Sequence, residues 1–394
     1  MATQTKDLKA SATNAVPTGK DAPFPFLDLK AQYATIKDEI LAVVHDVLRD
    51  QHFIMGPQVP AFEREMEREV KARFAIGCAS GSDAILLALM AYDLGPGDEV
   101  ITTPFTFVAT AGSIARLRAK PVFVDIDPAT FNIDTKKIAT AVTSKTRAFM
   151  PVHLFGLPSD LDPFMKLGAE KNIPVIEDAA QAIGSEYHGK RVGAIGDIGC
   201  FSFFPSKNLG GAGDGGLLTT NSEKLNDKLK VLRIHGSRTK YDYELLGMNS
   251  RLDTIQAAIL SVKLKHLHAW ADARRRNADR YRALIAEFGL QDKVKAPQVP
   301  AGYTHVYNNF VIRVKERDAL KNFLKERGVP SEIYYPSPLH LQPAFKNLGY
   351  KQGDFPESEA AAKEVLAIPI YPELTEAQLR RVVQAISDFY EGGR

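Results

Sequence analysis

Short apolar runs alternate with amphipathic stretches from Phe74 onward, and this alternation constrains the fold more than any other feature of the chain. The short runs predict buried strands, and the stretches between them predict helices that return the chain across a sheet. Strands joined in this way run parallel, so the pattern predicts a mainly parallel α/β sheet. The predicted strands are Phe74–Cys78, Glu99–Thr102, Pro121–Asp125, Ala148–Leu154 and Pro174–Glu177, and the predicted helices are Asp83–Tyr92, Phe107–Arg118, Thr135–Val142 and Leu161–Lys171.

The pattern changes after Glu177. Two apolar runs, Gly199–Phe204 and Gly216–Asn221, have no helix between them, so we expect these strands to be joined directly. A helical pattern resumes at Glu223–Ile234, and a long helical stretch runs from Thr254 to about Phe288. Beyond it the sequence predicts a strand at Asn308–Val314 and helices at Arg317–Arg327 and Thr375–Tyr390.

The length of the chain favours two domains. It has 394 residues, and hydrophobic cores usually divide beyond roughly 250–300 residues. We predict a large domain over residues 23–263 and a smaller α+β C-terminal domain over residues 264–394. Residues 1–22 contain no apolar run and are predicted to be a disordered extension.

Composition excludes several classes of protein. The 50 Lys+Arg and 47 Asp+Glu residues nearly balance, which argues against a nucleic-acid partner. The only cysteines, Cys78 and Cys200, lie in apolar surroundings without metal-ligand spacing. They predict no disulfide framework, no metal site and a reducing, cytoplasmic location. No apolar run is long enough to predict a membrane span.

Candidate binding groups follow the ends of the predicted strands, where open α/β sheets bind ligands. The segment Ser80-Gly81-Ser82-Asp83-Ala84 opens a helix, so its free backbone N–H groups can bind a phosphate. Taken alone, it is explained equally well by ordinary N-capping through Ser82 or Asp83. One ring of Phe105-Thr106-Phe107 can stack on a flat ring, with core packing as the alternative.

An aspartate and a lysine complete the pattern. Asp178 ends a strand and can keep a pyridine nitrogen protonated, and Gln181 can bond the phenolic oxygen of the same ring. Lys207 lies among aromatic residues and glycines, where its pKa can fall and its amine can form a Schiff base. Ser202 and Ser206 are further phosphate donors. A surface lysine and a structural aspartate are the alternatives when each residue is taken alone.

The glycines after Lys207 also match Gly-x-Gly-x-x-Gly, at Gly211, Gly213 and Gly216. A dinucleotide site needs that motif between a strand and a helix, but here a strand follows it, so we reject the match. An anion-binding turn, an aromatic ring, an aspartate and a lysine, all at strand ends of one sheet, together predict a pyridoxal phosphate site.

With these motifs the chain resembles the DegT/DnrJ/EryC1/StrS sugar aminotransferases, pyridoxal phosphate enzymes of the aspartate aminotransferase fold. The resemblance runs from about Pro25 to the C-terminus and implies fold type I, with a mainly parallel seven-stranded sheet between helices. Besides the segments above, it rests on Phe53-Ile54-Met55-Gly56-Pro57, Pro104-Phe105-Thr106-Phe107-Val108-Ala109-Thr110, Pro151-Val152-His153, Ile176-Glu177-Asp178-Ala179-Ala180-Gln181, Phe201-Ser202-Phe203-Phe204-Pro205-Ser206-Lys207-Asn208 and Asn249-Ser250-Arg251-Leu252-Asp253.

The resemblance implies a role for each site residue. Lys207 would form the Schiff base, Asp178 would pair with the pyridine nitrogen, and both would be catalytic. Cofactor contacts would come from Phe107 on the ring, Gln181 near the ring hydroxyl, and Gly81, Ser82 and Ser202 on the phosphate, with Asn249 from the other subunit of a homodimer. Ser82 stands where the family often has threonine, and it keeps the hydroxyl.

Substrate contacts are predicted at Arg251, Tyr335 and His340, in segments that resemble the family's substrate-facing regions, with surface or interface roles as the alternative. His153, His235 and His305 are predicted to be structural, because Schiff-base chemistry already supplies a base.

The predicted reaction moves nitrogen from an amino donor, which the resemblance implies is L-glutamate, through the pyridoxamine phosphate form of the cofactor to a ketone of a nucleotide-linked deoxysugar, with C3 preferred. The alternatives are a dehydratase, whose family relatives carry histidine at the lysine position, a cofactor-bound regulator, and more distantly a nicotinamide dehydrogenase.

Overall fold

The computed structural model describes residues 23–392 of the chain. The predicted extension at residues 1–22 lies outside the described residues. Two helices, α1 (Leu29–Asp50) and α2 (Gln58–Val70), precede the alternating region. That region follows the predicted order closely: β1 (Phe74–Cys78), α3 (Gly81–Ala91), β2 (Glu99–Thr102), α4 (Val108–Arg116), β3 (Lys120–Phe123), β4 (Thr146–Phe149), α6 (Asp162–Lys171), β5 (Ile176–Asp178), β8 (Ile198–Ser202), β9 (Gly216–Thr220) and α7 (Glu223–Leu232).

The central sheet has seven strands in the order β3-β2-β4-β5-β8-β9-β1. A three-stranded part and a four-stranded part are regular ladders. Backbone hydrogen bonds between the β4 and β5 segments join them, from Phe149 N to Pro174 O and from Asp178 N to Pro151 O, both 2.9 Å. Only β9 runs antiparallel to its neighbours, β8 and β1, because a direct connection reverses the chain. The predicted fold class, with its mainly parallel seven-stranded sheet, is confirmed.

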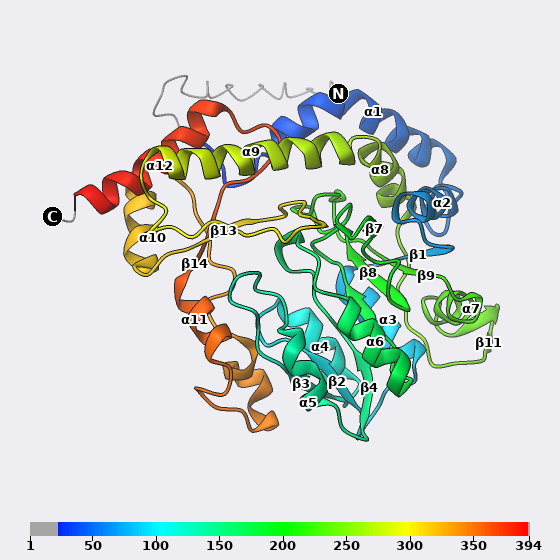
Figure 1. Ribbon diagram of the computed structural model, residues 1–394. Helices are drawn as coiled ribbons and strands as arrows, with labels where there is room; N and C mark the ends of the chain where they lie inside the picture. The colour runs from blue at the N-terminus through cyan, green and yellow to red at the C-terminus, as the bar shows by residue number, and fades with distance from the viewer. Residues whose placement is uncertain (1–22, 393–394) are drawn as a thin grey trace, which may run out of the picture.

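Helices cover both faces of this sheet (Figure 1). Side chains alternate between the faces along each strand, so Phe201 and Leu217 pack under α2 and α8 (Thr254–Leu264). Their neighbours Cys200 and Leu218 pack on the opposite face, against α3 and α7. This arrangement buries both faces of the sheet, which explains why its strands are continuous apolar runs.

The remaining elements belong to connections and to the C-terminal part of the chain. A β13–β14 antiparallel pair packs with α9, α10 and α12 around a separate apolar core, which also contains Phe24. The bounds of these elements are η2 (Leu154–Gly156), β6 (Glu186–Tyr187), β7 (Lys190–Arg191), β10 (Ser237–Thr239), β11 (Asp242–Tyr243), α9 (Leu267–Glu287), β12 (Tyr303–Thr304), β13 (Phe310–Arg313), α10 (Arg317–Glu326), η3 (Leu339–Leu341), η4 (Pro343–Leu348), α11 (Pro356–Glu364), β14 (Val365–Ile368) and α12 (Glu376–Glu391). The division at residues 263 and 264 stays a prediction.

Two predicted helices differ in detail. The stretch from Thr254 to Phe288 forms two helices, α8 and α9, because the chain turns at Lys265 and His266. The expected helix at Thr135–Val142 is only a 3-10 turn, η1 (Thr135–Lys137), followed by a single turn, α5 (Ile138–Ala141). The closing helix α12 begins at Glu376, and its N-cap Thr375 forms a capping box with Gln378 that satisfies N–H groups at the start of the helix. Within residues 23–392, no helix combines the length and apolar character that a membrane span needs.

Candidate active site

A cavity of about 590 Å³ lies at the carboxyl ends of the sheet strands. It brings together residues that are far apart in the sequence: Asp178 ends β5, Ser202 ends β8, and the turn after β1 stands beside them. The C-terminal part of the chain closes the other side. Of the predicted site residues, the cavity is lined by Gly81, Ser82, Phe107, Asp178, Gln181, Ser202, Lys207 and Tyr335.

Lys207 is half-buried in this cavity, in the loop that follows β8. The loop folds back tightly: the Gly211 N–H donates to Phe203 O at 2.7 Å, and a Cβ at Gly210 would lie 2.3 Å from Pro205 O. The glycine therefore permits an approach that no side chain would allow. Burial lowers the pKa of Lys207 to about 8, although the negative charge of Asp178 raises it in part. At pH 7 roughly a tenth of this amine is then neutral, and hence nucleophilic.

Asp178 is buried at the end of β5, and two donors fix its carboxylate. Thr110 Oγ1 donates to Oδ2 at 2.7 Å, and the backbone N–H of Ala180 donates to Oδ1 at 3.2 Å. Burial raises the pKa of Asp178, while these hydrogen bonds and the charge of Lys207 oppose the rise. A cation beside the carboxylate would favour its ionised form, which suits the site to a protonated ring nitrogen.

The turn between β1 and α3 offers free backbone donors. Ser80 is the N-cap, and its Oγ accepts the Asp83 N–H at 3.1 Å, so the capping role falls to Ser80 rather than to Ser82 or Asp83. The first N–H groups of α3, at Gly81 and Ser82, have no acceptor inside the helix and face an anion site. A Cβ at Gly81 would lie 2.5 Å from Ser202 Cβ, so the glycine lets the turn and the end of β8 meet.

Aromatic residues and an amide line the cavity next to Asp178. Phe105 is fully buried and packs in the core, which was the alternative for this segment. Phe107 is 56% exposed and lines the cavity. Gln181 Oε1 accepts the Phe155 N–H at 2.7 Å, and Gln181 Nε2 donates to the Tyr335 hydroxyl at 3.3 Å. The Tyr335 ring lies 6.4 Å from that of Phe107, so the two rings and the amide border one space.

The model of the DegT/DnrJ/EryC1/StrS aminotransferase family matches residues 34–387. The chain belongs to this family. A pleiotropic regulatory protein of Geobacillus stearothermophilus is 52% identical over 93% of this chain and 98% of its own length. A UDP-N-acetyl-3-dehydro-alpha-D-glucosamine 3-aminotransferase of Acidithiobacillus ferrooxidans is 45% identical over 93% of this chain and 98% of its own length. The crystal structure of S. venezuelae DesV in complex with a ketimine intermediate has a TM-score of 0.91 at 38% identity and covers 94% of this chain and 99% of its own.

The predicted family is thus confirmed, and the aminotransferase relatives support the predicted activity and cofactor. Three of the predicted site residues, Asn249, Arg251 and His340, do not line the cavity. Asn249 is exposed, Arg251 is half-buried, and neither lines the cavity of its own chain. His340 is buried, where its Nε2 bonds Glu359 Oε1 at 3.1 Å and its ring packs against Phe355. The roles of these three residues stay predictions.

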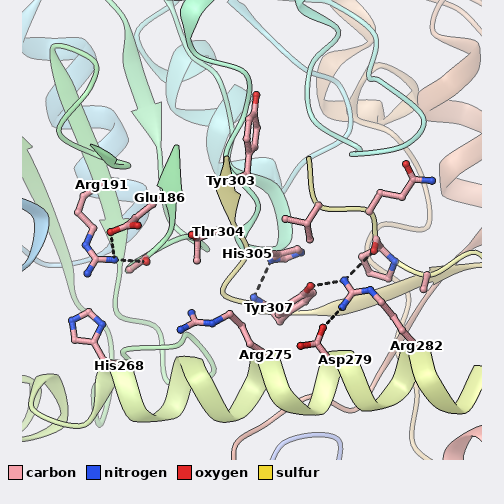
Figure 2. A pocket seen from close by; sticks show the side chains of 15 residues that line it. Glu186, Arg191, His268, Arg275, Asp279, Arg282, Tyr303, Thr304, His305 and Tyr307 are labelled. Atoms are coloured by element: carbon pink, nitrogen blue, oxygen red, sulfur yellow. Dashed lines mark hydrogen bonds and ion pairs between the residues drawn. The ribbon is translucent and has the colours of Figure 1, made fainter. Parts of the chain in front are cut away.

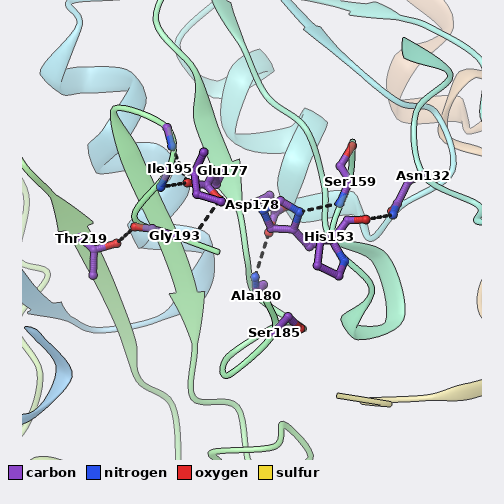
Figure 3. Close-up of polar contacts among 12 residues, drawn as sticks. Asn132, His153, Ser159, Glu177, Asp178, Ala180, Ser185, Gly193, Ile195 and Thr219 are labelled. Atoms are coloured by element: carbon purple, nitrogen blue, oxygen red, sulfur yellow. Dashed lines mark hydrogen bonds and ion pairs between the residues drawn. The ribbon is translucent and has the colours of Figure 1, made fainter. Parts of the chain in front are cut away.

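Among the histidines, His153 is enclosed in a buried polar network (Figure 3). The Ser159 N–H donates to His153 Nδ1 at 2.9 Å, so Nε2 carries the hydrogen and donates to Glu177 Oε2 at 3.0 Å. His305 is also buried, and its Nδ1 accepts the Tyr307 N–H at 3.0 Å. His235 is exposed. None of the three lines the cavity. The buried hydrogen bonds of His153 and His305 support structural roles, and the role of the exposed His235 stays a prediction.

A larger depression, of about 1070 Å³, lies over α9 (Figure 2). Its arginines are ion-paired: Arg191 with Glu186 at 3.2 Å, Arg282 with Asp279 at 2.9 Å, and Arg275 with Asp272. Because its charges are compensated within the chain and Lys207 and Asp178 are absent from it, this depression does not serve the chemistry described above.

Several lining residues escaped the sequence analysis: Thr110, Arg274, Asn308 and Asn309. Thr110 follows Thr106 by four positions, and the two hydroxyls lie 3.1 Å apart, so a helical spacing from the recognised aromatic segment could have indicated it. Arg274 belongs to the run Arg274-Arg275-Arg276, and nothing in the local sequence distinguishes it from its neighbours.

Proposed function

We propose that this protein is a pyridoxal phosphate-dependent aminotransferase that moves the amino group of L-glutamate to a keto carbon, C3, of a nucleotide-linked sugar. One observation carries the proposal: Lys207, with its lowered pKa, shares a cavity with the buried carboxylate of Asp178 and an anion-binding helix N-terminus. Few chemistries need a nucleophilic amine, a fixed carboxylate and a phosphate site together.

The residues present fit this cofactor. Gly81 and Ser82 supply backbone donors for a phosphate, together with the Ser202 hydroxyl beside them. Asp178 supplies the partner for a ring nitrogen, Phe107 an exposed ring, and Gln181 an amide held in place by Phe155. When bound, the cofactor supplies an aldehyde that captures amines and a ring that accepts the electrons of a carbanion.

The side chains then have distinct tasks. Asp178 holds the proton on the ring nitrogen, and Thr110 and Ala180 orient its carboxylate. Lys207 Nζ would take a proton from the Cα of the amino donor and deliver it to C4′ of the cofactor, and in the second half it would move a proton from C4′ to the sugar carbon. Its lowered pKa suits both directions, because an amine titrating near pH 8 can accept and donate at physiological pH.

Relatives support the choice of substrate and carbon. The 45% identical relative from Acidithiobacillus ferrooxidans is named for a UDP-linked sugar and for amination at C3. Others, at 40% and 42% identity, are named for a 3-oxo-glucuronate aminotransferase and a 3-amino-dideoxygalactose transaminase. The glutamate donor rests on the family resemblance, and the cytoplasmic location rests on the cysteine content.

A homodimer with shared active sites is part of the proposal. Helix α1 buries Ile36, Ile40 and Val47 but leaves large apolar side chains exposed on another face, at Tyr33, Leu41 and Leu48. The segment that includes β10 and β11 carries Tyr241, Tyr243 and Leu246, and Leu246 is 94% exposed. Such apolar surface favours a second copy of the chain. Asn249 follows this segment and would reach the neighbouring cavity.

The test is a coupled assay with L-glutamate and 3-keto UDP- and dTDP-sugars. We expect turnover in the wild type, a loss of at least about 1,000-fold in Lys207→Ala, and little change in Lys224→Ala, an exposed lysine on α7. Borohydride reduction of the loaded enzyme followed by peptide mapping should label Lys207. Labelling of another lysine, or full turnover by Lys207→Ala, contradicts the proposal.

A regulatory protein is the second candidate, because the 52% identical relative is named a pleiotropic regulator. Cofactor binding without turnover on the ketosugar panel would favour it. A dehydratase would consume the sugar without taking nitrogen from glutamate, so the same assay separates all three.

A further inference from the structure

The C-terminal part of the chain places a buried positive charge on the cavity that the proposed mechanism does not use. Arg274, on α9, lines the cavity and is only 3% exposed. Its Nη1 donates to two backbone oxygens, Tyr307 O at 3.0 Å and Ile370 O at 2.6 Å. No carboxylate in the described residues forms an ion pair with it. The charge of Glu373 acts on the guanidinium from beyond ion-pair distance and raises its pKa against the effect of burial. Because no carboxylate contacts the guanidinium directly, its free N–H groups can bind an anionic ligand.

The remaining nitrogens of Arg274 are available to such a ligand. Neither Nε nor Nη2 has a hydrogen-bond partner among residues 23–392. Both nitrogens keep some accessible surface, so a ligand in the cavity can contact them. These two N–H edges form the planar fork that binds a carboxylate with two parallel hydrogen bonds.

Asn308 provides an independent sign of a missing ligand. Its side chain is 9% exposed, lines the same cavity, and donates from Nδ2 to Asn309 Oδ1 at 2.7 Å. Its Oδ1 is buried without a hydrogen-bond partner among residues 23–392, a state that buried polar atoms rarely keep unless a ligand or water completes them. An amino acid carries both missing groups, a carboxylate for the guanidinium and N–H donors for an amide oxygen.

We propose that Arg274 and Asn308 form the subsite that binds a carboxylate of the amino donor. The inference rests on the proposed function, which requires a donor in this cavity but does not say what holds it. Lys207 and Asp178 come from the large sheet, whereas this subsite comes from α9 and the segment before β13. A donor would therefore contact both the large sheet and the C-terminal part of the chain.

The experiment separates the two half-reactions by the absorbance of the bound cofactor. In Arg274→Gln and in Asn308→Asp, which adds a charge that repels a carboxylate, we expect the Kd for L-glutamate to rise at least tenfold. The rate of the second half-reaction, with the ketosugar, should stay within about threefold of the wild-type rate. The matched control is Arg275→Gln, because Arg275 is the next residue of α9 and lines the other depression (Figure 2).

Amino-acid analogues identify which carboxylate is bound. 4-Aminobutyrate lacks the α-carboxylate, and L-2-aminobutyrate lacks the side-chain carboxylate. The preference for glutamate over one of them should disappear in Arg274→Gln. Because Arg274 also braces two backbone oxygens, circular dichroism must show a folded variant; if it is not folded, Asn308→Asp decides.

Equal losses in both half-reactions, no loss in either, or a loss confined to the sugar half-reaction would overturn this subsite. The last result would assign the guanidinium to a carboxylate on the sugar. Failure of the proposed function looks different, because the wild type itself would then show no donor half-reaction.

Discussion

Thr110 on α4 donates a 2.7 Å hydrogen bond to Asp178 at the end of β5, although 68 positions separate the two residues. Thr106, one helical turn earlier, lies 3.1 Å from the Thr110 hydroxyl and extends the chain of polar groups. The contact forms because β2, which precedes α4, lies next to β4, and β4 lies next to β5. Helix α4 thus begins over the aspartate and fixes its carboxylate.

We expect Thr110→Val to weaken catalysis by misorienting Asp178. A hydrogen bond to a charged group contributes about 1.5–3 kcal/mol, so kcat should fall roughly 10- to 100-fold. The hydroxyl also lowers the pKa of Asp178 against the effect of burial. Without it the carboxylate protonates more readily, and activity should be lost at a higher pH as the solution is acidified. Rate profiles across pH measure both effects.

Thr110→Ser is the matched control, since it keeps the hydroxyl and should retain most of the wild-type rate and the wild-type acid limb. If valine and serine give the same profile, the hydrogen bond is not what matters at this position.

The reactivity of Lys207 in the cofactor-free protein should titrate near pH 8. Burial lowers its pKa from 10.5 to about 8, so acylation by an amine reagent, mapped by mass spectrometry, should rise through pH 8. The unfolded chain holds this proton up to about pH 10.5, so between these values folding stability rises with pH. Lys207→Met should lack that rise.

Asp178→Asn provides the counterpart, because the charge of Asp178 raises the pKa of Lys207. Its loss should move the midpoint of the Lys207 titration to lower pH. A wild-type midpoint near 10 would show that the amine is solvated rather than buried.

Glu177→Gln should destabilise the fold beside the active site. The buried carboxylate accepts three backbone N–H groups, from Gly193 at 2.7 Å, Ile195 at 2.9 Å and Gly196 at 2.6 Å. It also accepts a hydrogen bond from His153 (Figure 3). A glutamine turns its own NH₂ toward these donors and leaves some unpaired, which should lower the free energy of unfolding by about 3 kcal/mol.

Urea denaturation of the cofactor-free protein measures this loss, with Glu170→Gln as an exposed control on α6. Equal stability of the two variants would mean that the network around Glu177 contributes little.

Local patterns in the sequence were sufficient for the fold class, and together with the family resemblance they predicted eight of the residues that line the cavity. Strand and helix periodicity predicts the order of elements. Because the carboxyl ends of parallel strands meet at one edge of the sheet, Asp178, Lys207 and the turn at Gly81 could be predicted to lie close together. The reversed strand β9 was also foreseeable, because no helix separates Gly199–Phe204 from Gly216–Asn221.

Other features depended on which surfaces meet. The chain shows the same aromatic character at Phe105 and Phe107, yet only packing decides that the first is buried and the second lines the cavity. The hydrogen bond from Thr110 to Asp178 and the burial of Arg274 beside Asn308 arise from elements far apart in the chain. The sequence by itself determined the layers of the fold and the residues at the strand ends, because periodicity and turn chemistry are local. Only the tertiary structure decided how those residues are oriented and which charges stay unpaired, because both depend on contacts between distant segments.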